Sequence, residues 1–306
     1  MLNALRANTK AGFLFAGIFF NTLLHGAVLL PMAPVKLLTP EGPRRHAVRR
    51  WLTRVAESWI GVNNGLLSLV RATRWHLEIP PYLDHEGCYL VVCNHQSWVD
   101  ILVLQRMFNR RLPLLRFFLK RELIWVPVLG LCWWALDFPF MHRASREQLK
   151  KRPELRGRDL ASARRACALF REVPVAMMSF PEGTRRREDK LRRETPYEHL
   201  LPPRAGGLGQ VIQALGDRLD GCVDVTLSYA MASGSDEPPG FWCLLRGDIA
   251  AVHAHAVLRP IPPELVGRDF TADKAARAAL HDWLAALWRD KDRRLGGGSE
   301  VDDTSP

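Results

Sequence analysis

The sequence predicts an α/β fold preceded by an amino-terminal hydrophobic helical segment. After Trp75, short apolar runs of strand length alternate with stretches of helical periodicity, which is typical of α/β proteins. Before it, the 25 residues from Ala11 to Val35 include no Asp, Glu, Lys or Arg. With 306 residues, 47% of them hydrophobic and 25% charged, the chain is long enough for one large domain and is neither disordered nor fibrous.

The stretch from Ala11 to Val35 is long enough to cross a hydrocarbon core about 30 Å thick. A signal peptide fits poorly, because the apolar stretch is too long and no cleavage site of small residues precedes a polar start. A helix of a soluble core rarely has so long an uncharged stretch at a terminus. We therefore expect a membrane anchor, either transmembrane or re-entrant, whose helix is ended early by Pro31 and Pro34.

Residues 59–75 (WIGVNNGLLSLVRATRW) have a Trp at each end and apolar residues between, which predicts an amphipathic helix at a membrane interface. Basic residues are more numerous after the hydrophobic stretch than before it: Arg6 and Lys10 precede it, and Lys36, Arg44, Arg45, Arg49 and Arg50 follow it. Because basic flanks stay inside, the rest of the chain is expected to face the cytoplasm. Residues 1–75 are thus predicted to form the membrane anchor.

A globular domain is predicted for residues 76–295, and the small, polar residues 296–306 are expected to be a disordered tail. Cys88–Cys93 (CYLVVC) predicts a buried strand, and the helical spacing of apolar residues after it predicts a helix that begins near Val99. Further strands are expected at residues 116–119, 137–140, 175–180, 223–229, 241–245 and 249–258. Amphipathic helices are expected at residues 160–173 and 272–289.

The net charge of +11 predicts an anionic partner: a nucleic acid, a phosphate-bearing ligand or an acidic membrane surface. Most of this charge falls between Arg143 and Arg193, where 16 Lys and Arg stand against 7 Asp and Glu. Such a run is usually a solvated face. Here the excess is too local for that explanation alone, so we expect the segment to contact the anionic partner.

The six cysteines contain no C-x-x-C pair, which argues against a disulfide framework and a four-cysteine zinc site and favours a reducing compartment. Four of them lie in apolar runs, where a thiol is usually a small buried hydrophobe. His253 and His255 share one face of a predicted strand, but no third ligand is near them in the sequence. A solvated strand face is therefore preferred over a metal site.

The segment Asn94-His95-Gln96-Ser97-Trp98-Val99-Asp100 lies where a strand gives way to a helix, and α/β sheets place their sites at the carboxyl ends of strands. A histidine base needs a fixed tautomer, which a carboxylate bonded to Nδ1–H supplies. On one straight helix, residues five apart point to different faces, so contact requires His95 to lie in the turn and Asp100 in the first helical turn. The alternative is that Asp100 only caps the helix and that His95 is an ordinary polar residue.

A second segment, Phe180-Pro181-Glu182-Gly183-Thr184-Arg185, follows another predicted strand. Gly183 allows close approach of the backbone, while Thr184 and Arg185 offer a hydroxyl and a fork of N–H donors to a phosphate. Lys120, at the start of KRELIWVPVLG, also follows a strand and could reach the same site. The alternatives are a strand-ending turn with solvated arginines and a surface lysine.

In this order along the chain, N-H-Q-S-W-V-D, K-R-E-L-x-x-x-P-x-x-G and F-P-E-G-T-R resemble the three main blocks of the glycerolipid acyltransferase family, which includes the 1-acylglycerol-3-phosphate O-acyltransferases (lysophosphatidic acid acyltransferases). The stretches FLKRELIWVPVLGLCWWALDFPFMHR and LLPPRAGGLGQVI are most similar to a bacterial inner-membrane branch related to lysocardiolipin acyltransferases. The resemblance covers about residues 51–293 and implies an α/β catalytic domain with a mixed central sheet flanked by helices.

The resemblance implies that His95 is the general base for a glycerol hydroxyl and that Asp100 orients it. The hydroxyl oxygen attacks the thioester of acyl-CoA or acyl carrier protein directly, without an acyl-enzyme. The residues that match the block for the acceptor's glycerol phosphate are Glu182, Gly183, Thr184 and Arg185, with Lys120 assisting. No metal or other cofactor is implied. Ser97 is not implied as a nucleophile, and the chain has no G-x-S-x-G elbow.

The implied reaction is acylation of the sn-2 hydroxyl of 1-acylglycerol-3-phosphate to phosphatidic acid, at the cytoplasmic face of a bacterial inner membrane and in contact with anionic lipids. Another lysophospholipid acceptor, such as lysophosphatidylglycerol, is an alternative, because residues 141–173 are longer and more basic than in compact members. A thioesterase that uses water and a non-catalytic basic lipid-binding protein are further alternatives. Nucleic acid is not expected as a partner, since no helix-turn-helix, RNP or zinc-finger pattern accompanies the charge.

Overall fold

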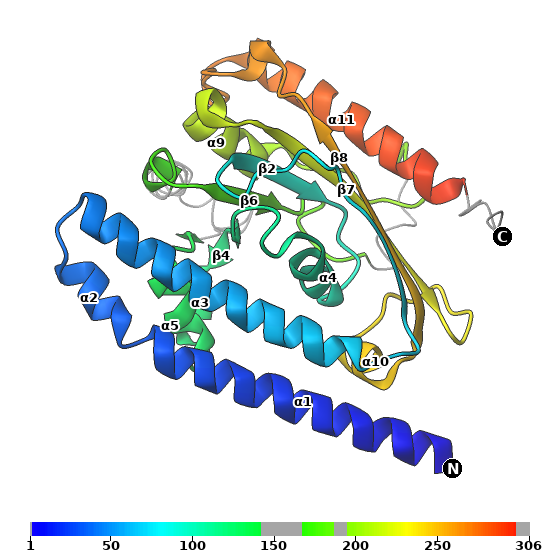
Figure 1. Cartoon of the computed structure of the whole chain (residues 1–306). Helices are drawn as coiled ribbons and strands as arrows, with labels where there is room; N and C mark the ends of the chain where they lie inside the picture. Colours follow the sequence, from blue (N-terminus) through cyan, green and yellow to red (C-terminus); the bar gives the residue numbers. More distant parts are fainter. Residues whose placement is uncertain (1, 142–166, 187–194, 298–306) are drawn as a thin grey trace.

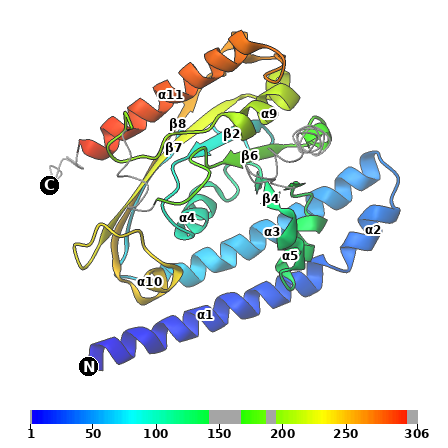
Figure 2. The ribbon, with the colours of Figure 1, turned by 180° about the vertical axis from the view of Figure 1, so that it is seen from behind.

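The computed structural model describes residues 2–141, 167–186 and 195–297, which form stacked layers (Figure 1). Two helices, α9 and α11, cover one face of the central sheet, and α4 covers the other. Beyond α4 lie α3 and then α1, and the view from behind shows the same order (Figure 2). The bounds of these helices are α1 (Leu2–Leu29), α3 (Pro43–Ser68), α4 (Val99–Phe108), α9 (Gly206–Leu215) and α11 (Lys274–Gly296).

The central sheet has six strands in the order β1-β8-β7-β2-β6-β3. Their bounds are β1 (Arg74–Glu78), β2 (Cys88–Cys93), β3 (Leu115–Phe117), β6 (Val175–Ser179), β7 (Gly221–Met231) and β8 (Ile249–Arg259). Neighbouring strands are parallel, except that β7 and β8 are antiparallel. The sheet is therefore mixed, as expected. A second sheet has two strands, β4 (Leu119–Lys120) and β5 (Phe140–Met141).

Strand β2 is buried on both faces because it lies inside the sheet, between β7 and β6. Its residues Tyr89, Val91 and Cys93 pack in one core cluster with α4. The alternate residues, among them Leu90 and Val92, pack on the other face with α9 and α11. An uninterrupted apolar run is what a strand covered on both faces requires, so the local pattern of CYLVVC identifies a central strand.

Helix α1 lies against α3 in an antiparallel pair (Figure 1). Asn21 Nδ2 donates to Asn63 Oδ1 at 2.8 Å, and Trp59 Nε1 donates to Thr22 Oγ1 at 3.1 Å. As predicted, α1 ends before Pro31, and the short helix α2 (Met32–Leu38) follows it. Polar pairs between buried positions hold the register of the two helices.

The inner side of α1 also belongs to the main core. Ala11 and Leu14 are fully buried in the cluster that contains α4 and β2. The outer side is apolar and open: Phe13 and Phe20 are 71% and 67% exposed. Among the described residues, one stretch, Leu5–Leu38, is long and apolar enough to cross a membrane, with 22% of its most hydrophobic window buried. The amino-terminal segment therefore shares a core with the sheet domain while presenting an apolar face outward.

Two predicted elements are wrong in type or extent. Helix α3 ends at Ser68, and Trp75 belongs to β1 instead of to a helix at 59–75, because RWHLE pairs along β8 at the sheet edge. Residues 241–245, expected as a strand, form the helix α10 (Phe241–Arg246), which ends at Gly247 with a left-handed φ of 83°. A short apolar run alone does not distinguish a strand from a buried helix.

Other elements differ in their bounds. The strand expected at 116–119 is divided into β3 and β4, and at 137–140 only Phe140 lies in a strand, because Asp137 has a φ of 61°. The strands at 175–180, 223–229 and 249–258 are present as β6, β7 and β8. Helix α11 continues past residue 289 to Gly296. Most of the helix expected at 160–173, and the tail from residue 298, fall outside the described residues.

The segment KRELIWVPVLG forms a compact corner. A 3-10 helix, η1 (Arg121–Trp125), leads into α5 (Leu129–Ala135), and Lys120 is the residue before η1. A Cβ on Gly130 would lie 2.2 Å from the Ile124 carbonyl oxygen. No side chain fits where α5 passes the backbone of η1, which explains the glycine of this block.

Candidate active site

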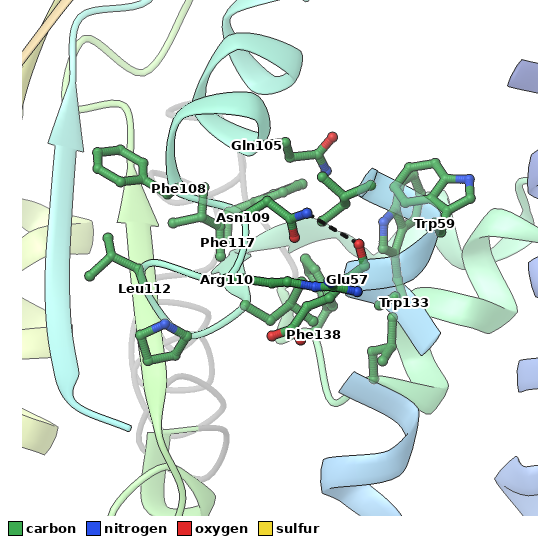
Figure 3. A pocket seen from close by; sticks show the side chains of 16 residues that line it. Glu57, Trp59, Gln105, Phe108, Asn109, Arg110, Leu112, Phe117, Trp133 and Phe138 are labelled. Atoms are coloured by element: carbon green, nitrogen blue, oxygen red, sulfur yellow. Dashed lines mark hydrogen bonds between the residues drawn. The ribbon is translucent and has the colours of Figure 1, made fainter. Parts of the chain in front are cut away.

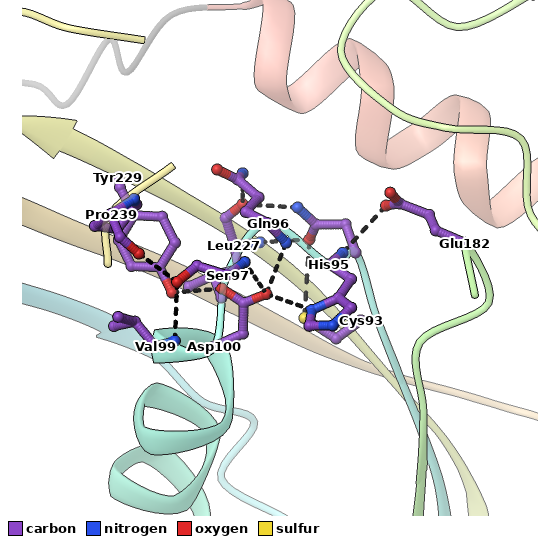
Figure 4. Close-up of polar contacts among 11 residues, drawn as sticks. Cys93, His95, Gln96, Ser97, Val99, Asp100, Glu182, Leu227, Tyr229 and Pro239 are labelled. Carbon is purple, nitrogen blue, oxygen red and sulfur yellow. Dashed lines mark hydrogen bonds and ion pairs between the residues drawn. The ribbon is translucent and has the colours of Figure 1, made fainter. Parts of the chain in front are cut away.

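The two main motifs meet at the carboxyl ends of β2 and β6 (Figure 4). Because these strands are parallel neighbours, the segments that follow them leave the sheet at the same edge. The Arg186 N–H donates to the His95 carbonyl oxygen at 2.8 Å, and the His95 N–H donates to Glu182 Oε1 at 3.1 Å. These hydrogen bonds join the loop after β2 to the loop after β6.

His95 and Asp100 form a hydrogen-bonded pair. His95 Nδ1 lies 2.8 Å from Asp100 Oδ2; the aspartate side chain is fully buried, whereas 16% of the histidine side chain is exposed. The Phe180 ring stacks on the imidazole, with 4.0 Å between centroids and 14° between planes. Since the carboxylate occupies Nδ1, Nε2 is the ring nitrogen that remains to accept a proton from a ligand.

Three further donors hold the Asp100 carboxylate. Its Oδ2 also accepts the N–H groups of Gln96 at 2.7 Å and Ser97 at 2.9 Å, and its Oδ1 accepts the Tyr229 hydroxyl at 2.6 Å. The chain turns around the carboxylate before α4 begins, which is how residues five apart come into contact. Tyr229 lies 129 residues away on β7, and sequence reasoning did not find it.

Asn94 joins the end of β2 to β7 through its side chain. Its Nδ2 donates to the Leu227 carbonyl at 2.8 Å, and its Oδ1 accepts the Leu227 N–H at 2.9 Å. Gln96 Nε2 donates to the same carbonyl at 2.8 Å. The amide of Asn94 thus continues the β2–β7 ladder after the main chain has turned away. Sequence reasoning also missed this role, because no periodicity marks it.

The Ser97 hydroxyl is occupied by structural hydrogen bonds. Its Oγ accepts the Val99 N–H at 2.9 Å and donates to the Pro239 carbonyl, and the residue is buried. Ser97 therefore caps the first turn of α4. Among the described contacts, the partners of the hydroxyl are main-chain groups.

Glu182 lies beneath the loop after β6, and only 3% of the residue is exposed. Burial raises the pKa of its carboxyl group to about 8, and the nearby Asp100 adds to the rise, while backbone N–H groups of His95 and Leu201 oppose it. Its carboxyl group faces the main chain of the His95 loop (Figure 4). The geometry makes Glu182 a support of that loop.

Replacing Glu182 by glutamine is expected to stabilise the protein in alkaline solution. A folded-state pKa near 8, above the ordinary 4.5, means that the folded protein binds more protons than the unfolded chain between these pH values. The free energy of unfolding of the wild type therefore falls as the pH rises from about 4.5 to 8. Glutamine removes this dependence, with a gain of the order of a few kcal/mol above pH 8.

The measurement is the melting temperature of wild type and Glu182→Gln from pH 5 to 9. The matched control is Glu264→Gln, an exposed glutamate. The gap between Glu182→Gln and wild type should widen with pH, whereas that for Glu264→Gln should stay constant. A gap for Glu182→Gln that does not change with pH would show that this carboxyl group titrates normally.

The remaining residues of the second motif, Gly183, Thr184 and Arg185, lie at or near the protein surface. Gly183 has a φ of 69°, in the left-handed region that suits glycine. Thr184 is half-buried and Arg185 is exposed, with its guanidinium 5.1 Å from the ring centre of Trp98, which is 60% exposed. Arg185 and Trp98 thus lie together at the surface above the His95 loop.

Lys120 follows β3, the strand next to β6. Because β3 is parallel to β6, the chain leaves β3 at the same edge of the sheet as the two motifs, and Lys120 then lies in β4. Its side chain is exposed, and among the described contacts it has no hydrogen bond or ion pair with His95, Glu182 or Arg185. The structure brings Asp100 and Glu182 into contact with His95 and leaves Lys120 and Arg185 as exposed cations.

Two cavities lie near opposite ends of α4. A cleft of about 120 Å³ lies beside the pair and is lined by Gln96, Arg186, Ser228 and Tyr229 among others. A second, mostly apolar cavity of about 50 Å³ lies between α3, α5 and the carboxyl end of α4, near Phe108 (Figure 3). Because α4 begins beside Asp100 and ends at Phe108, this second cavity lies at the far end of the helix from His95.

The other candidate ligands do not gather into a metal site in the described part of the chain. His253 stacks on His76 with 4.6 Å between ring centroids, and His255 Nε2 lies 3.4 Å from Glu78 Oε2. No group of three or more His, Cys, Asp or Glu side chains there could hold a metal ion. Five cysteines are buried, and burial raises the pKa of Cys88 to about 11. Most of the basic segment 143–193 lies outside the described residues.

Known acyltransferases are similar to this chain in sequence. The model of the Acyltransferase family matches residues 74–230, from β1 into β7. The chain is 28% identical over 301 residues to lysocardiolipin acyltransferase 1 of Danio rerio, covering 92% of this chain and 69% of the relative. It is 28% identical over 225 residues to 1-acyl-sn-glycerol-3-phosphate acyltransferase gamma of Mus musculus, covering 69% of this chain and 54% of the relative.

A solved structure has the same fold. The crystal structure of the 1-acyl-sn-glycerophosphate (LPA) acyltransferase PlsC from Thermotoga maritima superposes with a TM-score of 0.59 at 16% identity, covering 96% of this chain and 98% of that one. The family match covers half of the chain and includes all three sequence blocks. The alternative of a non-catalytic lipid-binding protein therefore has no support. The chain belongs to the glycerolipid acyltransferase family and is an acyltransferase.

Proposed function

We propose that the protein transfers a fatty acyl group from acyl-CoA or acyl carrier protein to the sn-2 hydroxyl of 1-acylglycerol-3-phosphate, forming phosphatidic acid. The observation that carries the proposal is the His95–Asp100 pair at the carboxyl end of β2, in which the carboxylate bonds Nδ1 and leaves Nε2 as the other ring nitrogen. The names of the relatives support a lysophospholipid acceptor. Lysophosphatidylglycerol and lysocardiolipin are the alternative acceptors.

The proposed chemistry requires one base and no covalent enzyme intermediate. His95 Nε2 takes the proton of the acceptor hydroxyl while the hydroxyl oxygen attacks the thioester carbonyl carbon and forms the new C–O bond. Asp100 stabilises the imidazolium that forms. The C–S bond then breaks, and the departing thiolate takes the proton from His95. No group other than acceptor and donor is consumed.

The acceptor's phosphate would lie beside the exposed cations at this edge of the sheet. Arg185 offers a planar fork of N–H donors and Lys120 a point charge, and the left-handed turn at Gly183 leaves the backbone accessible. The Thr184 hydroxyl would add a neutral donor. Glu182 would act indirectly, since its buried carboxyl group is bonded to the His95 N–H and supports the loop of the base.

We also propose that the protein works at a membrane surface, through residues 1–75, at the cytoplasmic face of a bacterial inner membrane. The exposed apolar face of α1 supports this proposal, and exposed tryptophans elsewhere, such as Trp125 at 85% and Trp242 at 42%, suit the interface. Its basic residues would favour anionic lipids.

The function is tested by supplying purified protein in lipid with labelled acyl-CoA or acyl carrier protein and, separately, each of the three lysophospholipids. Phosphatidic acid formation at the highest kcat/KM is the expected result. A higher value with another acceptor would replace the substrate but keep the reaction class. Transfer to none of them, or release of free fatty acid in excess of transfer, would overturn the proposal in favour of another acceptor class or a thioesterase.

Membrane binding is expected to weaken when the apolar face of α1 is made cationic. The double substitution Phe13→Lys and Phe20→Lys changes two exposed rings, so the fold should persist while partition into lipid falls several-fold. The measurement is cosedimentation with phosphatidylcholine–phosphatidylglycerol vesicles. The control adds the same charge at exposed positions of α11 on the opposite side, Ala275→Lys and Ala278→Lys (Figure 1). Equal sedimentation of both variants would contradict binding through α1.

A further inference from the structure

We propose that Tyr229 is a positioning residue of the active site, whose hydroxyl holds the Asp100 carboxylate and thereby sets the basicity of His95. The inference rests on the proposed role of His95 as the base. It assigns a function to a residue of β7 that lies outside the three sequence blocks.

The two oxygens of Asp100 have unequal surroundings. Oδ2 accepts three hydrogen bonds, from His95 Nδ1 at 2.8 Å and from the N–H groups of Gln96 and Ser97 at 2.7 and 2.9 Å. Among the described contacts, Oδ1 accepts one, from the Tyr229 hydroxyl at 2.6 Å. Asp100 is fully buried. The phenol is therefore the sole described partner of one half of a buried carboxylate.

Tyr229 is itself held in place and keeps its proton. It follows Leu227 by two residues on β7, and Leu227 is clamped to β2 by the side chain of Asn94. Burial and the neighbouring Asp100 raise the pKa of the phenol well above its ordinary value. The hydroxyl is thus a permanent donor toward Asp100, on a strand whose position relative to His95 is fixed by hydrogen bonds at Asn94.

Other titratable groups lie on the elements around the pair. They are Cys93 at the end of β2, Glu182 after β6, Asp224 on β7, whose charge acts on Cys93, and Lys291 on α11, whose charge acts on both Cys93 and Glu182. Burial raises the pKa of the Cys93 thiol well above its usual range, so it stays neutral in the range where a histidine titrates. The pKa of the Glu182 carboxyl group is about 8, and this group accepts the main-chain N–H of His95. Cys93, Glu182 and Lys291 have no described hydrogen bond to the Asp100 side chain, whereas the Tyr229 hydroxyl donates to it.

Removing the hydroxyl should make His95 more basic and less well aligned. Without the Tyr229 donor, the negative charge of Asp100 is less dispersed and attracts the imidazolium proton more strongly. The acid limb of the pH profile of kcat/KM should then move to higher pH. Loss of one hydrogen bond to a charged group corresponds to about a tenfold fall in kcat. KM for the acceptor should be unchanged, since the phenol is directed at Asp100.

The experiment compares wild type, Tyr229→Phe and the exposed control Tyr82→Phe, with acyl transfer measured from pH 5 to 9. The proposal is supported if Tyr229→Phe alone shows an upward shift of the acid limb, a lower kcat and an unchanged KM. It is overturned if the profile of Tyr229→Phe matches that of the control, or if only KM changes. Wild-type transfer that is lost in His95→Ala establishes the underlying reaction separately, so the two proposals fail independently.

A second variant covers the case in which Tyr229→Phe does not fold. Incorporation of 3-fluorotyrosine at position 229 preserves the shape of the side chain and makes the phenol a stronger donor. The acid limb should then move to lower pH, opposite to the shift in Tyr229→Phe. An unchanged limb with the fluorinated side chain would overturn the proposal, because a purely packing role does not depend on the acidity of the hydroxyl.

Discussion

Replacing His95 by alanine is expected to lower acyl transfer by about 10³-fold to 10⁴-fold, the effect of losing a positioned general base. The methyl side chain cannot take the proton of the acceptor hydroxyl, and no other base in the described site lies beside Asp100 in its place. The measurement is kcat/KM for labelled acyl transfer by protein in lipid, together with the melting temperature as a check of folding.

The matched control for this prediction is His281→Ala, since His281 is exposed on α11, on the far face of the sheet. Its activity should equal that of the wild type. If His95→Ala folds and retains more than about a tenth of wild-type activity, His95 is not the base, and the proposed mechanism must be abandoned even though the family assignment stands.

Replacing Asp100 by asparagine is expected to lower kcat by about 10³-fold while the fold persists. The asparagine side chain is nearly the same size, and its carbonyl oxygen can still accept the N–H groups of Gln96 and Ser97. His95 Nδ1 bonds the same oxygen as these two N–H groups, so the carbonyl would still accept Nδ1–H and the amide would face Tyr229. The neutral side chain would no longer stabilise the positive charge that forms on His95 when it takes the acceptor's proton, which is the reason for the fall in kcat.

Two measurements separate this explanation from simple destabilisation. The first is kcat of Asp100→Asn against Asp282→Asn, which changes an exposed aspartate of α11 in the same way. The second is the melting temperature of both variants. Wild-type kcat in a folded Asp100→Asn would mean that the carboxylate only caps α4, which is the structural alternative that the sequence leaves open.

Structural features predicted from the sequence are present where the signal is local. CYLVVC identified a central strand because a strand buried on both faces needs an unbroken apolar run. The polar residues directly after β2 and β6 were expected at one edge because parallel strands share their carboxyl ends. The His95–Asp100 contact could be stated as a condition on the turn, and the structure meets that condition.

The prediction failed where distant pairing decides the outcome. Residues 241–245 have the composition of a strand, but the sheet edge beside β8 is taken by RWHLE, and these residues form α10 instead. For the same reason Trp75 lies in β1 and not at the end of an amphipathic helix. Local propensity is weaker than the hydrogen bonds and burial that an available sheet edge supplies.

The sequence by itself determined the family, the candidate pair of His95 and Asp100 and the apolar character of the first helix, because each is encoded within a few neighbouring residues. Only the tertiary structure decided that Tyr229 completes the surroundings of Asp100, that Asn94 extends the sheet through its side chain, and that Glu182 faces the main chain of His95. These contacts join residues 87 to 133 positions apart. They arise from the order of strands in the sheet, which no periodicity in the chain records.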